Sequence, residues 1–303
     1  MIRVHINDPL DQEALNLLKS KSQLQVTCEH LDKDKLLELI PQIEVLIVRS
    51  ATKVTEDLIN KGEKLKVIGR AGVGLDNIDV TAAKQKGIKV LNTPGASSIS
   101  VAELTFGLIL SASRHIARGT CDLKKGLWTK KELEGHELYG KTIGIVGLGT
   151  IGKEVAKRSI AFGMKVIAYD PFVEYFEGVK MVSLEELFTN SDIITLHVPL
   201  SNETKHMINS ETISKMKDGV IIINASRGGV IDEQALYDAL SSGKIYAAAL
   251  DVFEVEPPAD DLRKKLLQLP NVTATPHIGA STHEAQAKVG RELVERIFAE
   301  LGI

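Results

Sequence analysis

The stretch Thr142-Ile-Gly-Ile-Val-Gly-Leu-Gly-Thr-Ile-Gly152 decides the fold of this chain. Its β-branched start predicts a strand, its later glycines predict a tight turn, and the residues from Glu154 to Phe162 have a helical pattern. A second strand, Lys165–Tyr169, follows and leads into Asp170, which stands 18 positions after Gly152. This order is that of a βαβ unit that binds a dinucleotide.

Five residues of this turn have predicted roles toward the dinucleotide. Gly147 permits the turn, Gly149 lets the backbone approach a pyrophosphate, and Gly152 lets the helix pack closely on the strand. The amides of Thr150 and Ile151, at the helix N-terminus, are expected to face the phosphates. A glycine-rich turn that binds no ligand is the alternative interpretation.

The acidic residue after the second strand indicates which dinucleotide is bound. Asp170 is expected to accept hydrogen bonds from the adenosine ribose and to repel a 2′-phosphate. No arginine follows it to reverse that preference. The predicted cofactor is therefore NAD rather than NADP.

The composition is that of an ordinary globular protein. The 303 residues suffice for two domains, and the net charge of −3 gives no general attraction to nucleic acid or to an anionic membrane. Cys28 and Cys121 form neither a disulfide framework nor a zinc pattern, so we expect reduced, partly buried thiols and no metal. The N-terminus has no signal-peptide pattern, and no apolar run is long enough to span a bilayer. We therefore expect a cytoplasmic protein.

Short β-branched runs alternate with helical segments along almost the whole chain. Most of these runs are apolar without alternation, as in parallel strands that are covered on both faces, so the fold class is α/β with doubly wound parallel sheets. Strands are predicted at Val4–Ile6, Val45–Val48, Val67–Gly69 and Val90–Leu91, then at Ile143–Val146, Val166–Tyr169, Ile193–Leu196, Val220–Ile223, Ala247–Leu250 and Val272–Ala274.

Helix starts are marked by Ser-x-x-Glu pairs, in which the serine caps the first turn. Ser100 with Glu103 predicts a long helix over residues 101–118. Ser281 with Glu284 predicts the C-terminal helix over residues 282–301. A third pair, Ser183 and Glu186, marks the start of another helix.

Three ionisable residues follow strand ends in the second part of the chain. Arg227, Glu256 and His277 could converge on one cleft, because ligands bind outside the carboxyl ends of parallel strands. An imidazole can exchange a hydroxyl proton, a carboxylate can orient it, and a guanidinium can hold an α-keto acid. A surface arginine, a loop acid and an interior histidine are the alternative interpretations.

Three longer motifs around these residues carry a family resemblance. Ile223-Asn-Ala-Ser-Arg-Gly-Gly-Val-Ile-Asp232, Leu250-Asp-Val-Phe-x-x-Glu-Pro257 and Pro276-His-Ile-Gly-Ala-Ser-Thr282 resemble the signatures of the D-isomer-specific 2-hydroxyacid dehydrogenases. Two N-terminal segments, Leu46–Thr55 and Val67–Asp79, are most similar to the phosphoglycerate dehydrogenase subgroup. The similarity extends over essentially the whole chain.

The resemblance implies roles for individual residues. His277 is the general acid and base, Glu256 is its partner, and Arg227 binds the carboxylate and carbonyl of the substrate. Asp251 and Ala225 contact the carboxamide end of the cofactor, and the adenosine side is lined by His197, Val198 and Pro199; a neutral histidine that merely ends a strand is the alternative for His197. The amides of Gly72, Val73 and Gly74 bind the substrate carboxylate, and Gly279 and Ala280 contact the cofactor.

The resemblance also implies the domain organisation. A Rossmann cofactor domain, residues 95–276, is inserted into a flavodoxin-like substrate domain built from residues 1–94 and 277–303. Hinges are expected near Pro94 and Pro276. Many phosphoglycerate dehydrogenases carry a C-terminal regulatory domain, whereas this sequence ends with its final helix, so we expect no regulation through such a domain.

The expected reaction is the NAD-dependent oxidation of D-3-phosphoglycerate to 3-phosphohydroxypyruvate, a step toward serine. Arg49, Lys53 and Arg70 are the candidates for binding the phosphate, with ordinary salt bridges as the alternative. The family implies a homodimer or a tetramer, with Trp128 near the contact, and Lys130 or Lys131 is a further candidate for the phosphate from a second subunit. A core residue is the alternative interpretation of Trp128. A glyoxylate or hydroxypyruvate reductase is the first alternative function, and an NAD-sensing scaffold that catalyses nothing is the second.

Overall fold

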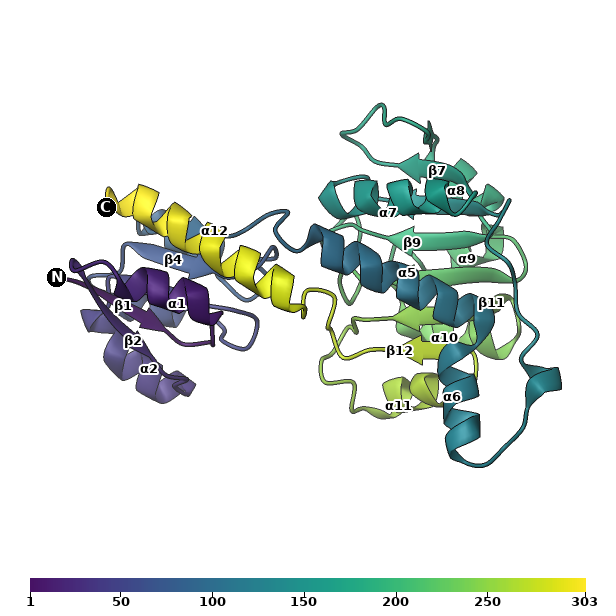
Figure 1. The fold of residues 1–303 in the computed structure, drawn as a ribbon, viewed down its shortest axis with the longest axis horizontal. Helices are drawn as coiled ribbons and strands as arrows, with labels where there is room; N and C mark the ends of the chain where they lie inside the picture. The colour runs from purple at the N-terminus through teal and green to yellow at the C-terminus, as the bar shows by residue number, and fades with distance from the viewer. The chain divides into compact units, whose positions relative to one another are not determined.

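The computed structural model describes residues 1–303, which form two compact α/β units (Figure 1). One unit consists of Met1–Ser97 and Ala280–Ile303, and the other is the continuous segment Ser98–Gly279. The continuous unit is therefore inserted into the discontinuous one. Each crossing lies three residues later than the predicted boundaries at 94 and 276, so that His277 is part of the inserted unit.

The outer unit has a five-stranded parallel sheet in the order β2-β1-β3-β4-β5, the flavodoxin-like order. Apolar residues of α1 and α12 cover one face of this sheet, and those of α2, α3 and α4 cover the other. Its elements are β1 (Ile2–Ile6), α1 (Gln12–Lys19), β2 (Leu24–Cys28), α2 (Lys33–Leu39), a 3-10 turn (Ile40–Gln42), β3 (Val45–Val48), α3 (Glu56–Lys61), β4 (Val67–Arg70), α4 (Val80–Gln85), β5 (Lys89–Leu91) and α12 (His283–Leu301).

The inserted unit has a seven-stranded parallel sheet in the order β12-β11-β10-β9-β6-β7-β8. Counted from β6, this is the Rossmann order 3-2-1-4-5-6 with a seventh strand at the edge. Its strands are β6 (Thr142–Val146), β7 (Lys165–Tyr169), β8 (Lys180–Met181), β9 (Ile193–Leu196), β10 (Val220–Asn224), β11 (Ile245–Leu250) and β12 (Val272–Ala274). The predicted fold class is confirmed.

Helices cover both faces of the seven-stranded sheet. Figure 1 shows α5 and α7 side by side on one face, where their apolar residues form one core with the strands. A second core lies on the other face, under α8 to α11. The helices are α5 (Ser98–Arg114), α6 (Ile116–Lys124), α7 (Thr150–Ala161), α8 (Leu184–Asn190), α9 (Ser210–Lys215), α10 (Glu233–Ser241) and α11 (Asp261–Gln268), with a 3-10 turn at Lys130–Glu132. None of the chain's helices is both long enough and apolar enough to cross a membrane.

The long helix predicted over residues 101–118 is wrong in its bounds. The structure has α5 over Ser98–Arg114 and a separate α6, because His115 between them adopts the left-handed conformation with φ of 53°. Such a residue interrupts the helical hydrogen-bond ladder. At its other end, α5 begins at Ser98, so Ser100 lies inside the helix and does not cap it.

The other two predicted caps are close to those observed. Ser183 accepts a hydrogen bond from the amide of Glu186, as predicted. At the C-terminal helix the cap is Thr282, which accepts from the amide of Ala285, one residue after the predicted Ser281.

Both cysteines are exposed, which corrects the prediction of partly buried thiols. Cys28 ends β2, an edge strand on which only Leu24 is buried. Cys121 lies on α6, a helix with no buried residue.

Candidate active site

The glycine turn between β6 and α7 leaves room beside the helix start. A β-carbon at Gly147, where φ is 93°, would lie 2.6 Å from the carbonyl oxygen of His197, and one at Gly152 would lie 2.1 Å from the carbonyl oxygen of Gly147. A β-carbon at Gly149 would meet nothing within 4 Å. The first and third glycines are therefore required by packing, whereas the second keeps the surface open for a close ligand such as a pyrophosphate.

The helix that follows offers an uncapped N-terminus. α7 begins at Thr150, and its N-cap residue Gly149 has no side chain to occupy the first amides. The first turn, which includes Thr150 and Ile151, also contains no acidic residue that would compete with an anion. The partial positive charge of a helix N-terminus thus remains available to phosphate groups, as a bound dinucleotide requires.

Asp170 lies directly beside this turn. Its Oδ2 accepts a hydrogen bond of 2.7 Å from the amide of Leu148, and its Oδ1 accepts one of 2.8 Å from the amide of Phe172. Each carboxylate oxygen has a further lone pair, so the side chain is held in place and can still accept from two ribose hydroxyls. The residues present therefore fit NAD.

The predicted acid–base pair is in direct contact in the inserted unit. Nδ1 of His277 lies 2.8 Å from Oε2 of Glu256. The side chains are 46% and 38% exposed, so the pair can be reached by a small molecule. With Nδ1 directed at the carboxylate, Nε2 is the ring nitrogen left for a proton exchange.

The charges around the pair perturb both pKa values. The hydrogen bond with Glu256 raises the pKa of His277, with added attraction from Glu256 and Asp251 and with burial and Arg227 acting in the opposite direction. Burial alone would raise the pKa of Glu256, but the bonds from His277 and the Phe253 amide, with the charges of His277 and Arg227, bring it below its usual value. Arg227 thus lies close enough to influence both groups.

The backbone around His277 is held by a buried carboxylate. Asp251 is 1% exposed, and its oxygens accept hydrogen bonds from the Thr275 hydroxyl at 2.6 Å and from the amides of Ile278 and Gly279 at 2.8 Å each. The amide of His277, whose φ is 53°, donates to the carbonyl oxygen of Asp251. Asp251 therefore fixes the histidine loop, and the contact with the cofactor that the resemblance implies for it stays a prediction.

Arg227 is positioned by the end of β10. Asn224 donates from Nδ2 to the carbonyl oxygen of Arg227 at 2.9 Å and accepts from the amide and hydroxyl of Ser226. Nη1 of Arg227 donates to the carbonyl oxygen of Ser226. Neither Asn224 nor the following Gly228 was singled out from the sequence, although both belong to the motif 223–232 that carries the resemblance.

The residues predicted on the adenosine side are near the glycine turn. The imidazole of His197 is neutral, because burial lowers its pKa to about 3, and its Nε2 contacts the Thr195 hydroxyl at 2.9 Å. A β-carbon at Gly147 would touch Val198 as well as His197. Pro199 is exposed, whereas Ala225 is buried after β10.

The outer unit carries the predicted substrate residues at one end of its sheet. Val48 pairs with Arg70 across β3 and β4, so Arg49 and Arg70 follow the same sheet edge. The guanidinium of Arg70 lies over Gly72, where a β-carbon would stand 1.5 Å from Nη1. The amide of Arg49 donates to the buried Asp8, which fixes the backbone of its loop.

The remaining predicted residues of the outer unit are exposed, half-buried or hydrogen-bonded through the backbone. Val73 accepts from the side-chain amide of Asn92, and Gly74 is half-buried. Lys53 is exposed. Ala280 accepts from Gln286 at the start of the returning segment.

The comparisons with known proteins agree with this architecture. Residues 106–279 match the family described as D-isomer specific 2-hydroxyacid dehydrogenase, NAD binding domain. Hydroxypyruvate reductase of Thermotoga maritima is 65% identical over 302 residues, which are 99% of each chain. D-3-phosphoglycerate dehydrogenase of Methanocaldococcus jannaschii is 55% identical over 98% of this chain but only 57% of its own length.

Solved structures show the same relationship in three dimensions. D-lactate dehydrogenase from Aquifex aeolicus, complexed with NAD and lactic acid, has a TM-score of 0.88 and 36% identity over 99% of this chain and 95% of its own. A glyoxylate reductase from Paecilomyes thermophila has a TM-score of 0.89 and 32% identity over 98% of this chain and 94% of its own. The chain belongs to the D-isomer-specific 2-hydroxyacid dehydrogenase family, and its inserted unit contains the NAD-binding domain of that family.

Proposed function

We propose that this chain interconverts a D-2-hydroxy acid and the corresponding 2-oxo acid, with His277 as the general acid and base. The 2.8 Å contact between His277 and Glu256, exposed at the strand ends of the NAD-binding unit, is the observation that carries the proposal. NAD, when bound, accepts or returns the hydride. Nε2 of His277 takes the hydroxyl proton during oxidation and returns it during reduction.

The other two residues of the trio support this proton transfer. Glu256 holds Nδ1 of His277 and stabilises the imidazolium that forms during oxidation. Arg227 supplies the guanidinium that binds the substrate carboxylate and polarises its carbonyl. We further propose that the amides of Gly72 to Gly74 help to bind the carboxylate, as backbone amides in a turn bind anions.

The pH dependence of reduction should depend on Glu256. Reduction requires protonated His277, and the contact with Glu256 raises the pKa of this histidine, so activity should fall only as the pH rises through that elevated pKa. Glu256→Gln removes the carboxylate charge, so the decline should begin at lower pH. The measurement is kcat/KM for a 2-oxo acid across the pH range, and an unchanged high-pH limb would contradict the assigned pairing.

The cofactor is proposed to be NAD rather than NADP. Asp170 supports this choice, because the Leu148 amide holds its carboxylate beside the glycine turn, and an acidic residue at this place in the motif repels a 2′-phosphate.

The substrate is proposed to have a three-carbon skeleton with an oxygen on C3. A phosphorylated form, D-3-phosphoglycerate with 3-phosphohydroxypyruvate, is supported by Arg49 and Arg70 at one sheet edge. The unphosphorylated form, hydroxypyruvate, is supported by the 65% identity to the T. maritima hydroxypyruvate reductase over nearly the whole of both chains. Each candidate thus rests on a different observation.

A substrate panel separates these two candidates. Hydroxypyruvate and 3-phosphohydroxypyruvate would each be tested with NADH and NADPH, and we expect NADH to be preferred. Arg49→Ala should lower kcat/KM for the phosphorylated substrate about 10- to 100-fold, the value of a charged hydrogen bond, and leave hydroxypyruvate nearly unaffected. Arg3→Ala, an exposed arginine in β1 of the same unit, is the control. Equal losses on both substrates would eliminate the phosphate site and leave hydroxypyruvate as the candidate.

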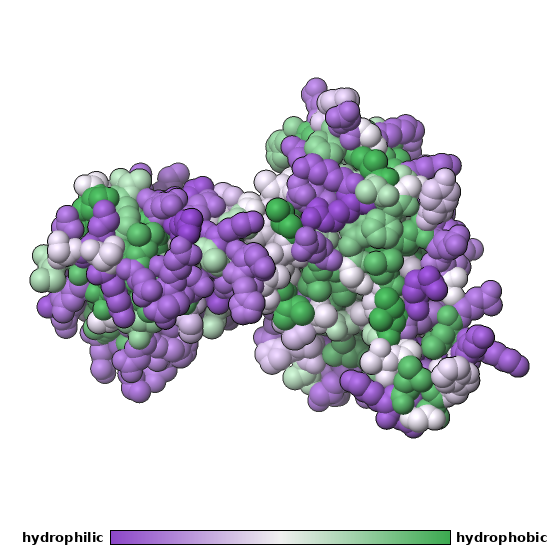
Figure 2. Space-filling view, in the orientation of Figure 1, coloured by the Kyte–Doolittle hydropathy of each residue, from purple (hydrophilic) through white to green (hydrophobic).

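We also propose that the protein is a homodimer that buries the surface of α6 and the segment after it. α6 has no buried residue, and Leu123, Leu127 and Trp128 are 61%, 49% and 80% exposed. Figure 2 shows apolar side chains among polar ones over this helix, at the lower right. Light scattering should report a dimer that Trp128→Ser weakens, whereas Tyr175→Ser, at another exposed aromatic residue, should not. A monomeric wild-type protein would contradict this assignment.

A further inference from the structure

A buried ion cluster lies beside the loop between β11 and α11, which carries Glu256. At its centre, Nε of Arg263 lies 2.7 Å from Oε2 of Glu233, and these side chains are only 9% and 5% exposed. Arg263 belongs to the first turns of α11, and Glu233 is the first residue of α10. Removing both charges from water costs free energy, which is offset only by good geometry and by further polar partners around the pair.

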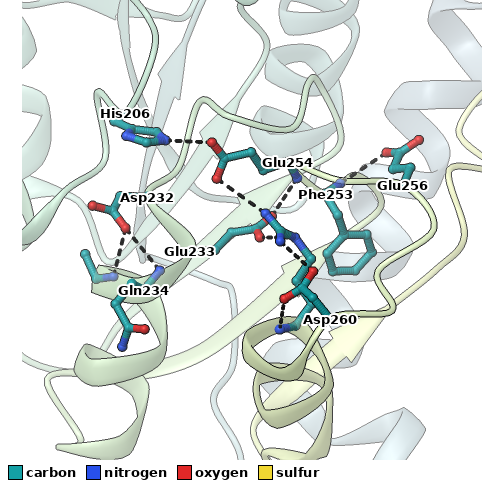
Figure 3. Close-up of polar contacts among 10 residues, drawn as sticks. His206, Asp232, Glu233, Gln234, Phe253, Glu254, Glu256 and Asp260 are labelled. Carbon is teal, nitrogen blue, oxygen red and sulfur yellow. Dashed lines mark hydrogen bonds and ion pairs between the residues drawn. The ribbon is translucent and has the colours of Figure 1, made fainter.

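Two more carboxylates surround the same guanidinium. Nη1 of Arg263 lies 2.6 Å from Oδ2 of Asp260, and Nη2 lies 3.4 Å from Oε2 of Glu254. The other oxygen of Glu254 lies 3.2 Å from Nε2 of His206 (Figure 3). One guanidinium therefore contacts three carboxylates, with His206 at the outer edge of the cluster.

The cluster is connected to the proposed acid–base pair through two backbone amides. The amide of Glu254 donates to Oε1 of Glu233 at 2.8 Å. The preceding amide, of Phe253, donates to Oε1 of Glu256 at 3.1 Å (Figure 3). These two amides lie on either side of the α-carbon of Phe253. Holding the Glu254 amide therefore restrains the neighbouring donor, the Phe253 amide, which holds the Glu256 carboxylate.

We infer that Arg263 and Glu233 are positioning residues, which act through the 253–256 loop to hold the Glu256 carboxylate against Nδ1 of His277. This inference rests on the proposed function, in which the histidine exchanges the substrate proton. Glu233 acts through its hydrogen bond with the Glu254 amide, and Arg263 acts through its ion pairs with Glu233 and Glu254. Neither residue contacts the reacting atoms. Their substitution should therefore lower kcat and the pKa of His277 and leave the binding of the cofactor nearly unchanged.

The charges predict what happens when Arg263 is removed. Glu233, Glu254 and Asp260 would then face one another without the guanidinium, and burial already raises the pKa of Glu233 in its presence. Repulsion and hydration of these carboxylates would loosen the loop, and Glu256 would spend less time on His277. The charged groups that act on His277 are Glu256, Asp251 and Arg227, so a weaker Glu256 contact lowers the pKa of the histidine.

The test uses Arg263→Met and Glu233→Gln in the full chain. Each should lower kcat for reduction of hydroxypyruvate about 10- to 100-fold, as displaced catalytic groups do, and leave KM for NADH within about 2-fold. The high-pH limb of kcat/KM should move to lower pH in both variants. Arg263→Lys keeps the charge but not the planar fork of the guanidinium. Its kcat, and the pH at which its kcat/KM declines, should therefore lie between those of Arg263→Met and the wild type.

A second measurement does not depend on activity. Histidines labelled with ¹³C at Cε1 allow the His277 resonance to be titrated, and its assignment follows from the spectrum of His277→Asn. The resonance should titrate at lower pH in Glu233→Gln than in the wild type. Glu233→Gln keeps the side-chain volume, but its single amide oxygen cannot both face Nε of Arg263 and accept from the Glu254 amide. One of the two contacts is therefore lost without a large change in packing, and the variant remains informative if Arg263→Met fails to fold.

The control is Arg158→Met. Arg158 also contacts two carboxylates in the inserted unit, those of Glu154 and Glu103, but it lies in α7. The Arg158→Met substitution should lower Tm without changing the pH at which kcat/KM declines. A lowered Tm with an unmoved limb and an unmoved His277 titration in Glu233→Gln would overturn the inference. If His277→Asn itself retained turnover, the proposed function would fail instead, so the two failures are distinguishable.

Discussion

His277→Asn is expected to lower kcat about 10²- to 10⁴-fold in both directions, the usual contribution of a positioned general acid or base. Asparagine tolerates the left-handed backbone conformation that residue 277 adopts, with φ of 53°, so the loop should keep its shape. It has no group that exchanges a proton near neutral pH. Steady-state rates with a 2-oxo acid and NADH, together with Tm and the affinity for NADH, would separate lost chemistry from lost structure.

The matched control is His115→Asn. His115 has the same φ of 53° but lies between α5 and α6, where its Nε2 contacts the Tyr246 hydroxyl. The His115→Asn variant should retain full turnover per active site. A His277→Asn enzyme that also retained turnover would refute the acid–base role, and a wild-type protein that turned over no 2-oxo acid would support the scaffold alternative.

Gly228→Ala is expected to damage both catalytic loops at once. A β-carbon at Gly228 would stand 1.8 Å from the carbonyl oxygen of Phe253 and 2.7 Å from the amide nitrogen of Glu254. Both are backbone atoms, so one loop must move away from the other, and Arg227 and Glu256 lie on opposite sides of this contact. We expect kcat/KM to fall by about 10²-fold or more. The free energy of unfolding should fall by about 1–3 kcal/mol, the usual result of overpacking.

Gly107→Ala is the matched control for this substitution. Gly107 lies inside α5, and a β-carbon there would meet nothing within 4 Å. Alanine in a helix interior is favoured over glycine by about 0.5–1 kcal/mol, so this variant should be at least as stable as the wild type. Equal stability and activity in Gly228→Ala would show that the two loops are not in contact.

The sheets could be predicted because ten of the twelve strands are short apolar runs, as buried parallel strands are. The two missed strands have physical reasons. β2 is an edge strand on which only Leu24 is buried, so its sequence alternates and lacks an apolar run. β8 has only two residues, Lys180 and Met181, and forms only because β7 pairs with it.

The three residues proposed for catalysis could be predicted from the sequence, whereas the residues that hold them in place could not. Arg227, Glu256 and His277 each follow a strand, and parallel topology alone places them at one sheet edge. The ion pair of Glu233 and Arg263 could not be predicted, because each residue resembles an ordinary charge near a helix start. Only the packing of α10 against α11 makes them partners. For the same reason the three donors to Asp251 could not be predicted, because they come together only in the folded loop.

The discontinuity of the outer unit has a consequence for the order in which the protein forms during synthesis. Leu293 and Ile297 of α12 are fully buried in the core that also contains β1, β3 and β4, and no other late segment covers that face. The strands β1, β3 and β4 therefore leave the ribosome long before α12, and one of their apolar faces stays uncovered until α12 has been translated. The continuous inserted unit, Ser98–Gly279, is complete by then. In vivo, the outer unit is thus expected to finish folding after the inserted unit, although its first strands are translated earlier.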